Sequence, residues 1–266
     1  MPSNTAPVEN KMGTMPVVRL ILNMSLPMIF SMLIQALYNI VDSIFVAQIG
    51  EDALTAVSLA FPVQNLMISF AVGTSVGVNA MLSMKLGQRD QESVDKFAMN
   101  GVFLSFCTYA VFFVLGLTCV MPYLQSQTSS FSIVEYGREY LCIVTTLGFG
   151  VFAGTMFDRL LQSTGRTFLA MISQIVGAVI NIIFDPLLIF GIGIFPKMGI
   201  RGAALATVLG QIVGLFVSVI LNIRCNKDIH FKVKNLIPRL KIVCDIYKTF
   251  VIGNFIKFLW VLTICS

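Results

Sequence analysis

Long apolar segments alternate with short polar segments along almost the whole chain. Six segments of mainly apolar residues reach about 20 residues, the length that crosses a bilayer as a helix. They cover residues 20–48, 55–84, 97–121, 140–161, 168–190 and 203–223. A seventh, weaker apolar segment covers residues 250–265. The pattern predicts an all-α fold, that of a polytopic membrane protein whose helices are joined by short loops.

The composition agrees with this prediction. Hydrophobic residues make up 56% of the chain and charged residues 12%, which excludes an ordinary soluble domain. The six cysteines lack C-x-x-C or metal-type spacing, so we interpret them as packing residues and not as disulfides.

Basic residues in the loops predict the orientation of the chain. With a cytoplasmic N-terminus, fourteen Lys and Arg residues, Arg159 among them, fall on the inner side and three on the outer side. This asymmetry follows the positive-inside rule and predicts a multi-pass protein of the cell membrane. The net charge of +5 therefore reports orientation and does not indicate nucleic-acid binding.

No motif supports an enzyme. The chain has no HExxH, Walker A or Rossmann glycine pattern. Residues 73–77 match G-x-S-x-G literally, but that motif needs a strand–turn–helix context and a histidine partner. His230, the one histidine, lies in the basic loop after the sixth segment, far from Ser75 in depth. We expect no catalytic residues and no cofactor.

Two carboxylates break the apolar pattern. Asp42 and Asp185 lie about six and five residues before the outer ends of the first and fifth segments, which places both roughly 8–9 Å inside the membrane. Asn181 precedes Asp185 by one helical turn, and Pro186 frees a backbone carbonyl. Ionisable residues at such depths usually mark functional sites, although a hydrogen bond to a neighbouring helix is the simpler alternative.

Other polar residues keep helical spacing with these acids. The first segment places Gln35, Tyr38 and Asn39 on the face of Asp42, the fifth places Gln174 with Asn181 and Asp185, and the sixth carries Thr207, Gln211, Ser218 and Asn222. If the three stripes face one another, they form a polar cleft within an apolar shell. Each stripe alone is also compatible with ordinary hydrogen bonding between helices.

Several motifs together resemble one transporter family. They are Leu26-Pro27, Tyr38-Asn-Ile-Val-Asp42, Arg159-Leu-Leu-Gln162-Ser-Thr-Gly165, Asn181-Ile-Ile-Phe-Asp185-Pro186 and Gly202-Ala-Ala-Leu-Ala-Thr207. Over residues 16–246 the chain resembles the MATE (multidrug and toxic compound extrusion) transporters of the DinF-like or MepA-like branch. The resemblance implies the six-helix N-terminal lobe of such a transporter plus the start of a seventh helix.

The resemblance also implies a function. It implies an H⁺- or Na⁺-coupled antiporter that exports amphipathic, often cationic drugs by alternating access, with the coupling ion in place of a cofactor. Asp42, Asn181 and Asp185 match the family's cation site, where Na⁺ is one candidate ion, and Thr207 matches a further position. Ionised, the two acids would attract a cation; protonated, they would release it.

Two alternatives stay open. A lipid-linked oligosaccharide flippase of the same superfamily would have a similar lobe with a cavity richer in arginine, and no arginine is expected mid-span here. An inactive or non-transporting membrane fragment would need no matched carboxylates.

The expected organisation has four parts: a polar cytoplasmic N-terminus (1–16), the six-helix lobe (17–223), a basic cytoplasmic linker (224–248) and a truncated or altered seventh helix (249–266). The last part lacks the Pro-Ser start of the family's seventh helix. A truncation or a frame change near Phe250 would explain this, and the family's C-terminal lobe would then be a missing partner of this one.

Overall fold

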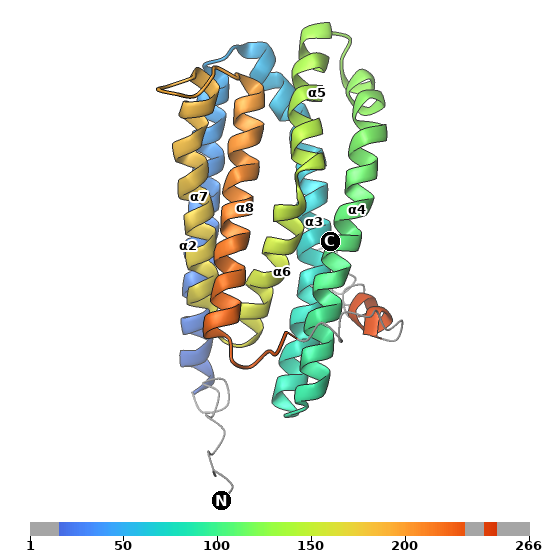
Figure 1. The fold of residues 1–266 in the computed structure, drawn as a ribbon, viewed down its shortest axis with the longest axis vertical. Helices are drawn as coiled ribbons and strands as arrows, with labels where there is room; N and C mark the ends of the chain where they lie inside the picture. Colours follow the sequence, from blue (N-terminus) through green and yellow to red (C-terminus); the bar gives the residue numbers. More distant parts are fainter. Residues whose placement is uncertain (1–15, 232–241, 249–266) are drawn as a thin grey trace, which may run out of the picture.

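The computed structural model describes residues 16–231 and 242–248, and within them it is all-helical (Figure 1). The long helices are α2 (Val17–Ala47), α3 (Glu51–Gly87), α4 (Gln91–Gln127), α5 (Phe131–Thr146), α6 (Phe149–Ser163), α7 (Thr167–Phe190) and α8 (Ile200–Cys225). Residues 242–248 form a further short helix. The predicted seventh span and the polar N-terminus before Pro16 lie outside the described residues.

The structure confirms the predicted fold class. Among the described residues, five helices are long and apolar enough to cross a membrane, and α5 with α6, bent by 44° at the break between them, reaches the length and hydropathy of a sixth. The sequence predicted one uninterrupted fourth span over residues 140–161. In the structure this span starts earlier, at Phe131, and breaks at Leu147 and Gly148.

Close packing explains why a glycine stands at this break. A Cβ on Gly148 would lie 2.8 Å from the Met67 side chain of α3 and 2.5 Å from the carbonyl oxygen of Val144. The Met67 contact involves the flexible end of a side chain, which can move, whereas the Val144 carbonyl oxygen belongs to the backbone at the end of α5. The glycine therefore avoids a backbone clash at the break itself.

The helices form a single lobe with α6 near its centre. In Figure 1, α2, α7 and α8 stand on one side and α3, α4 and α5 on the other. The lower half of the lobe is joined by α6, which contacts α3, α4, α7 and α8. Side chains on α6 are therefore placed to meet both groups of helices.

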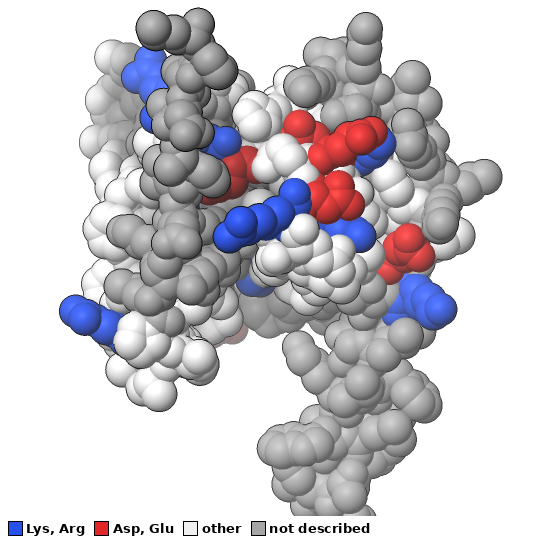
Figure 2. All heavy atoms as spheres, turned by 90° about the horizontal axis from the view of Figure 1, so that it is seen from below, with Lys and Arg blue, Asp and Glu red and all other residues white. Residues whose placement is uncertain are grey.

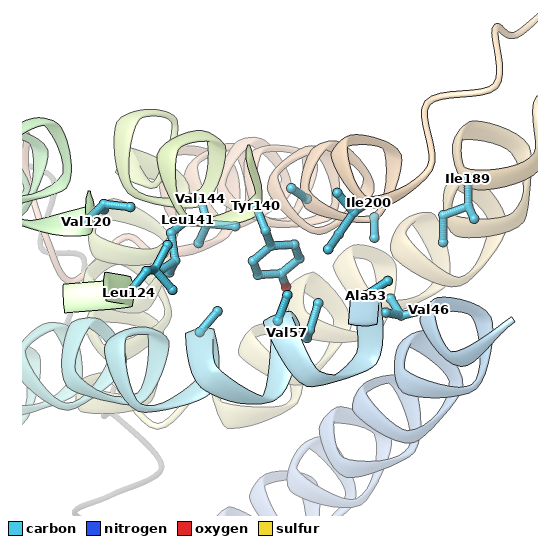
Figure 3. Close-up of a cluster of buried hydrophobic side chains, with 14 residues drawn as sticks. Val46, Ala53, Val57, Val120, Leu124, Tyr140, Leu141, Val144, Ile189 and Ile200 are labelled. Carbon is cyan, nitrogen blue, oxygen red and sulfur yellow. The ribbon is translucent and has the colours of Figure 1, made fainter. Parts of the chain in front are cut away.

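A cluster of buried apolar side chains fills the upper half of the lobe (Figure 3). Tyr140 of α5 lies in it at 1% exposure, beside Val57 of α3 and Ile200 of α8. Large apolar side chains on the outside of the lobe stay exposed instead; Val18 and Met32 of α2 are 72% and 65% exposed. A bilayer covers such surfaces, so they are expected in a membrane protein.

Small residues bring α7 and α8 into contact. A Cβ on Gly177 would lie 2.9 Å from the Gly210 carbonyl oxygen, and one on Gly210 would lie 2.6 Å from the Gly177 carbonyl oxygen. The pair Gly210 and Gly214, spaced as G-x-x-x-G, thus serves close helix packing, as that spacing commonly does.

The lower end of the lobe carries a dense group of charges, visible in Figure 2. Arg166 pairs with Asp228 at 3.1 Å, Lys85 with Asp90 at 3.8 Å, and Lys96 with Glu92. The pKa of the Asp90 carboxyl lies below its ordinary value, mainly because the carboxyl accepts hydrogen bonds from Ser93 at the start of α4.

The described parts of the predicted linker are bound to this end of the lobe. The backbone N–H of His230 donates to Asp95 Oδ1 at 2.9 Å. Ile229 and Ile246 are buried, at 4% and 0% exposure, in an apolar cluster with Val78 and Leu82 of α3. These described segments of the predicted basic linker are therefore packed against the lobe.

Candidate functional site

A cavity of about 330 Å³ lies among α2, α3, α6, α7 and α8. Its apolar wall includes Met28, Met171 and Leu215. The polar residues on its wall include Gln35, Tyr38, Asp158, Arg159, Gln162, Gln174, Asn181, Thr207 and Gln211. An apolar shell with a few polar groups converging on it is the usual form of a ligand site.

Asn181 connects this cavity to a buried acid. With its amide oxygen towards α8, the side chain accepts the backbone N–H of Thr207 at 3.2 Å and donates to Asp185 Oδ2 at 3.2 Å. Asp185 is 0% exposed, whereas Asn181 and Thr207 reach the cavity wall. The predicted one-turn spacing on α7 therefore does bring Asn181 onto Asp185, and α8 adds Thr207.

Asp42 lies on α2, which packs against α7. It is 8% exposed and lies within electrostatic range of Asp185. Its Oδ1 atom is buried and accepts no hydrogen bond from any residue that the structure describes. An unpaired buried acceptor is costly, so it fits a group that takes up a proton or a cation.

Tyrosines surround the acid pair. Both Tyr38 and Tyr140 lie within electrostatic reach of Asp42. The Tyr140 hydroxyl accepts from Gln64 Nε2 at 3.1 Å. Tyr140 escaped the sequence analysis because it stood at the edge of a predicted span, where a tyrosine is common.

Most of the predicted cleft residues line the cavity. Gln35, Tyr38, Gln174 and Gln211 do so, and the buried Gln211 Oε1 has no hydrogen-bond partner among the described residues. Asn39 is a correction: it is exposed and lies outside the cavity lining. On a helix it sits about 100° around the axis from Tyr38, so its side chain points away from that of Tyr38.

A third carboxylate, Asp158, reaches the lower part of the cavity. The charge pattern placed Arg159 on the inner side, but α6 continues for four residues beyond it, and the side chains of Asp158 and Arg159 both line the cavity. Arg159 thus lies near the lower end of its span, as the sequence predicted, with its side chain also on the cavity wall. Arg159 Nη1 donates to Gln162 Oε1 at 2.7 Å.

The lower half of the predicted stripe on α8 serves packing. Ser218 donates to Asp158 Oδ1 at 2.7 Å, and Asn222 Nδ2 donates to the Phe157 carbonyl oxygen at 2.9 Å. Both side chains are 0% exposed and both bind α6. Hydrogen bonding between helices, the alternative left open for each stripe, holds for these two residues.

The fold and the cavity define a class: a polytopic helical membrane protein with buried carboxyl groups beside a polar cavity, the arrangement found in membrane transporters. The MatE family model matches residues 27–187. The chain therefore belongs to the MATE family, and the match covers the helices that supply Asp42, Asp158, Asn181 and Asp185.

Individual relatives support this assignment. An FAD transporter from Shewanella oneidensis is 33% identical over 206 residues, which are 76% of this chain and 45% of the relative. The probable multidrug resistance protein NorM from Thermotoga maritima is 28% identical over 201 residues, 73% of this chain and 42% of the relative. A solved MOP superfamily transporter from Pyrococcus furiosus matches with a TM-score of 0.80 and 28% identity, covering 88% of this chain and 51% of that one. The chain spans about half the length of the curated relatives it matches.

Proposed function

We propose that this chain is one lobe of a cation-coupled antiporter that exports amphipathic, often cationic small molecules in exchange for H⁺ or Na⁺. The observation that carries the proposal is the path from Asp185 through Asn181 to the cavity wall, with the unpaired Oδ1 of Asp42 beside it. Ion and substrate sites thus share the same two helices, α2 and α7.

The donor set suits both coupling ions. Two carboxylates, an amide and a hydroxyl offer the oxygen ligands that hard cations prefer, and either carboxylate can take a proton instead. When Asp42 and Asp185 are ionised, they attract a cation or a cationic substrate. When they are neutral, that attraction is lost, and substrate leaves.

A second lobe would complete the transporter. Since the relatives are about twice as long as this chain, we propose that another chain or segment supplies the facing half of the substrate path. We also propose a cytoplasmic N-terminus, which the charge group at the lower end of the lobe supports through the positive-inside rule.

The test is binding of a coupling ion and of a cationic dye to the chain in lipid nanodiscs. In the unaltered chain, Na⁺ or acid pH should displace ethidium, and ethidium should displace the ion. Asp185→Asn should abolish this competition, because the neutral amide keeps the volume of the side chain but not its charge. Asp95→Asn is the matched control: Asp95 is also a buried carboxylate, 3% exposed, at the lower end of the lobe away from Asp185. Competition that survives in Asp185→Asn as in Asp95→Asn would refute the proposed site.

One observation favours a second candidate substrate class. Arg159 places a positive charge on the cavity wall, and one relative is an FAD transporter, whose substrate carries phosphates. If the chain carries such an anion, Arg159→Gln should weaken FAD binding by tenfold or more without weakening ethidium binding. Binding of ethidium but not FAD by the unaltered chain would exclude this candidate.

A further inference from the structure

Asp158 is the carboxylate that meets the cavity directly. Asp42 and Asp185 are 8% and 0% exposed and lie behind the cavity wall, whereas Asp158 is a wall residue and keeps part of its surface open. It lies well below the other acids. Its partner Ser173 precedes Asn181 by eight residues on α7, a separation of about 12 Å along the helix.

Three neutral donors from two other helices hold this carboxylate. Ser173 Oγ and Ser218 Oγ lie 2.6 and 2.7 Å from Asp158 Oδ1, and Gln174 Nε2 donates to Oδ2 at 3.0 Å. These donors satisfy an ionised carboxylate, which only accepts hydrogen bonds.

The same arrangement also accommodates a proton. Ser173 Oγ lies within hydrogen-bond distance of two acceptors, Asp158 Oδ1 at 2.6 Å and the Ala170 carbonyl oxygen at 2.8 Å. One hydroxyl hydrogen serves one of them at a time. If Asp158 carries a proton, it donates to Ser173, whose own hydrogen then goes to Ala170. Every donor stays satisfied in both states without movement of a heavy atom.

The charges around Asp158 are few. Arg159 of its own helix is the cation that acts on it, and α7 and α8 present the neutral side chains just named. The described charged residues of α3 and α4 lie near helix ends: Glu51, Asp52, Lys85, Glu92, Asp95 and Lys96. With Asp158 ionised, the lower part of the cavity is balanced; with Asp158 neutral, the charge of Arg159 remains alone.

We propose that Asp158 is a second proton-binding site of the lobe, located in the cavity wall and separate from the Asp42 and Asp185 pair. Taking up a proton there makes the lower cavity net positive, which repels a cationic substrate. This consequence rests on the proposed function, because it takes the cavity as the substrate path. The proton site itself does not depend on transport.

The experiment is pH-difference infrared spectroscopy of the chain in lipid nanodiscs, which reports the C=O band of each carboxyl group as it gains a proton. Asp158→Asn should remove one titrating band, and the control Asp95→Asn should retain that band. Ser173→Ala keeps the carboxyl group but removes the shared hydroxyl, so the same band should shift in frequency. Identical titrating bands in Asp158→Asn and the unaltered chain would overturn the proposal.

Two features keep the result decisive. If Asp158→Asn does not fold, the Ser173→Ala spectrum still tests the site, and an unshifted band there overturns it. Asp185→Asn should remove a different band. If the competition with ethidium survives in Asp185→Asn, the proposed ion site is refuted, and the Asp158 band is unaffected by that result.

Discussion

Replacing Gly210 by alanine should both loosen the packing of α7 on α8 and weaken ion binding at the site formed by Asp42, Asn181 and Asp185. The new Cβ would lie 2.6 Å from the Gly177 carbonyl oxygen and 3.1 Å from the Asn181 Cβ, so the helices must separate. A radial gap of roughly 0.5–1 Å forfeits about a quarter to a half of the dispersion energy across the contact. Overpacking of this kind costs about 1–3 kcal/mol.

The same shift reaches the site directly. It moves Asn181 away from the backbone N–H of Thr207, a hydrogen bond of 3.2 Å that has little length to spare. At about 2–4 °C per kcal/mol for a chain of this size, the predicted loss lowers Tm by roughly 2–12 °C. Thermal unfolding in nanodiscs, followed by circular dichroism, measures it, and the ion competition assay should weaken in parallel.

Gly87→Ala is the matched control. It changes the last residue of α3, where an added Cβ meets nothing within 4 Å. Its Tm should equal or slightly exceed that of the unaltered chain, because alanine favours a helix. If Gly210→Ala unfolds at the same temperature as Gly87→Ala, the close contact between α7 and α8 does not stabilise the lobe, and the reasoning fails.

Three further predictions concern the lower end of the lobe. Ile246→Ala should cost about 2–5 kcal/mol and lower Tm, because Ile246 is fully buried against α3, whereas Tyr247→Ala, at 36% exposure, should change Tm little. Asp90→Ala should lower Tm at pH 7, because the ionised carboxylate caps α4. Hydrogen bonds from Ser93 lower the pKa of this carboxyl in the folded protein. The difference in Tm between the two proteins therefore persists above the ordinary pKa of about 3.9 and disappears as the pH falls through the lowered native value. In a variant whose one cysteine is the exposed Cys225, a membrane-impermeant maleimide should label the protein only after cells are permeabilised, and labelling of intact cells would reverse the proposed orientation.

Periodicity and hydrophobicity predicted the spans well but their ends poorly. Each span is apolar over the thickness of a bilayer, which a sequence shows directly. Helices continue into polar residues wherever caps and ion pairs support them: α4 begins at Gln91, six residues before the predicted segment, capped by Asp90. The cap is a local polar contact with Ser93, and the glycine at the bend between α5 and α6 avoids a backbone clash, so neither leaves an apolar signature.

The candidate site divides in the same way. The four-residue spacing from Asn181 to Asp185 predicted a contact that the structure contains, because that contact lies within one helix. The partners of Asp158 come from α7 and α8, and only the packing of α5 brings Tyr140 within electrostatic reach of Asp42. An acid near the end of an apolar segment looks solvated until the neighbouring helices are known.

Both carboxylate sites depend on one pair of helices. Above the glycine contact, Asn181 of α7 binds Thr207 of α8; below it, Ser173 of α7 and Ser218 of α8 bind Asp158 of α6. Close-packed helices transmit strain because they have few voids to absorb it. A change of charge at either site therefore acts on the same helix pair. This explains why a single methyl group at the glycine contact is expected to disturb ion binding without touching either carboxylate.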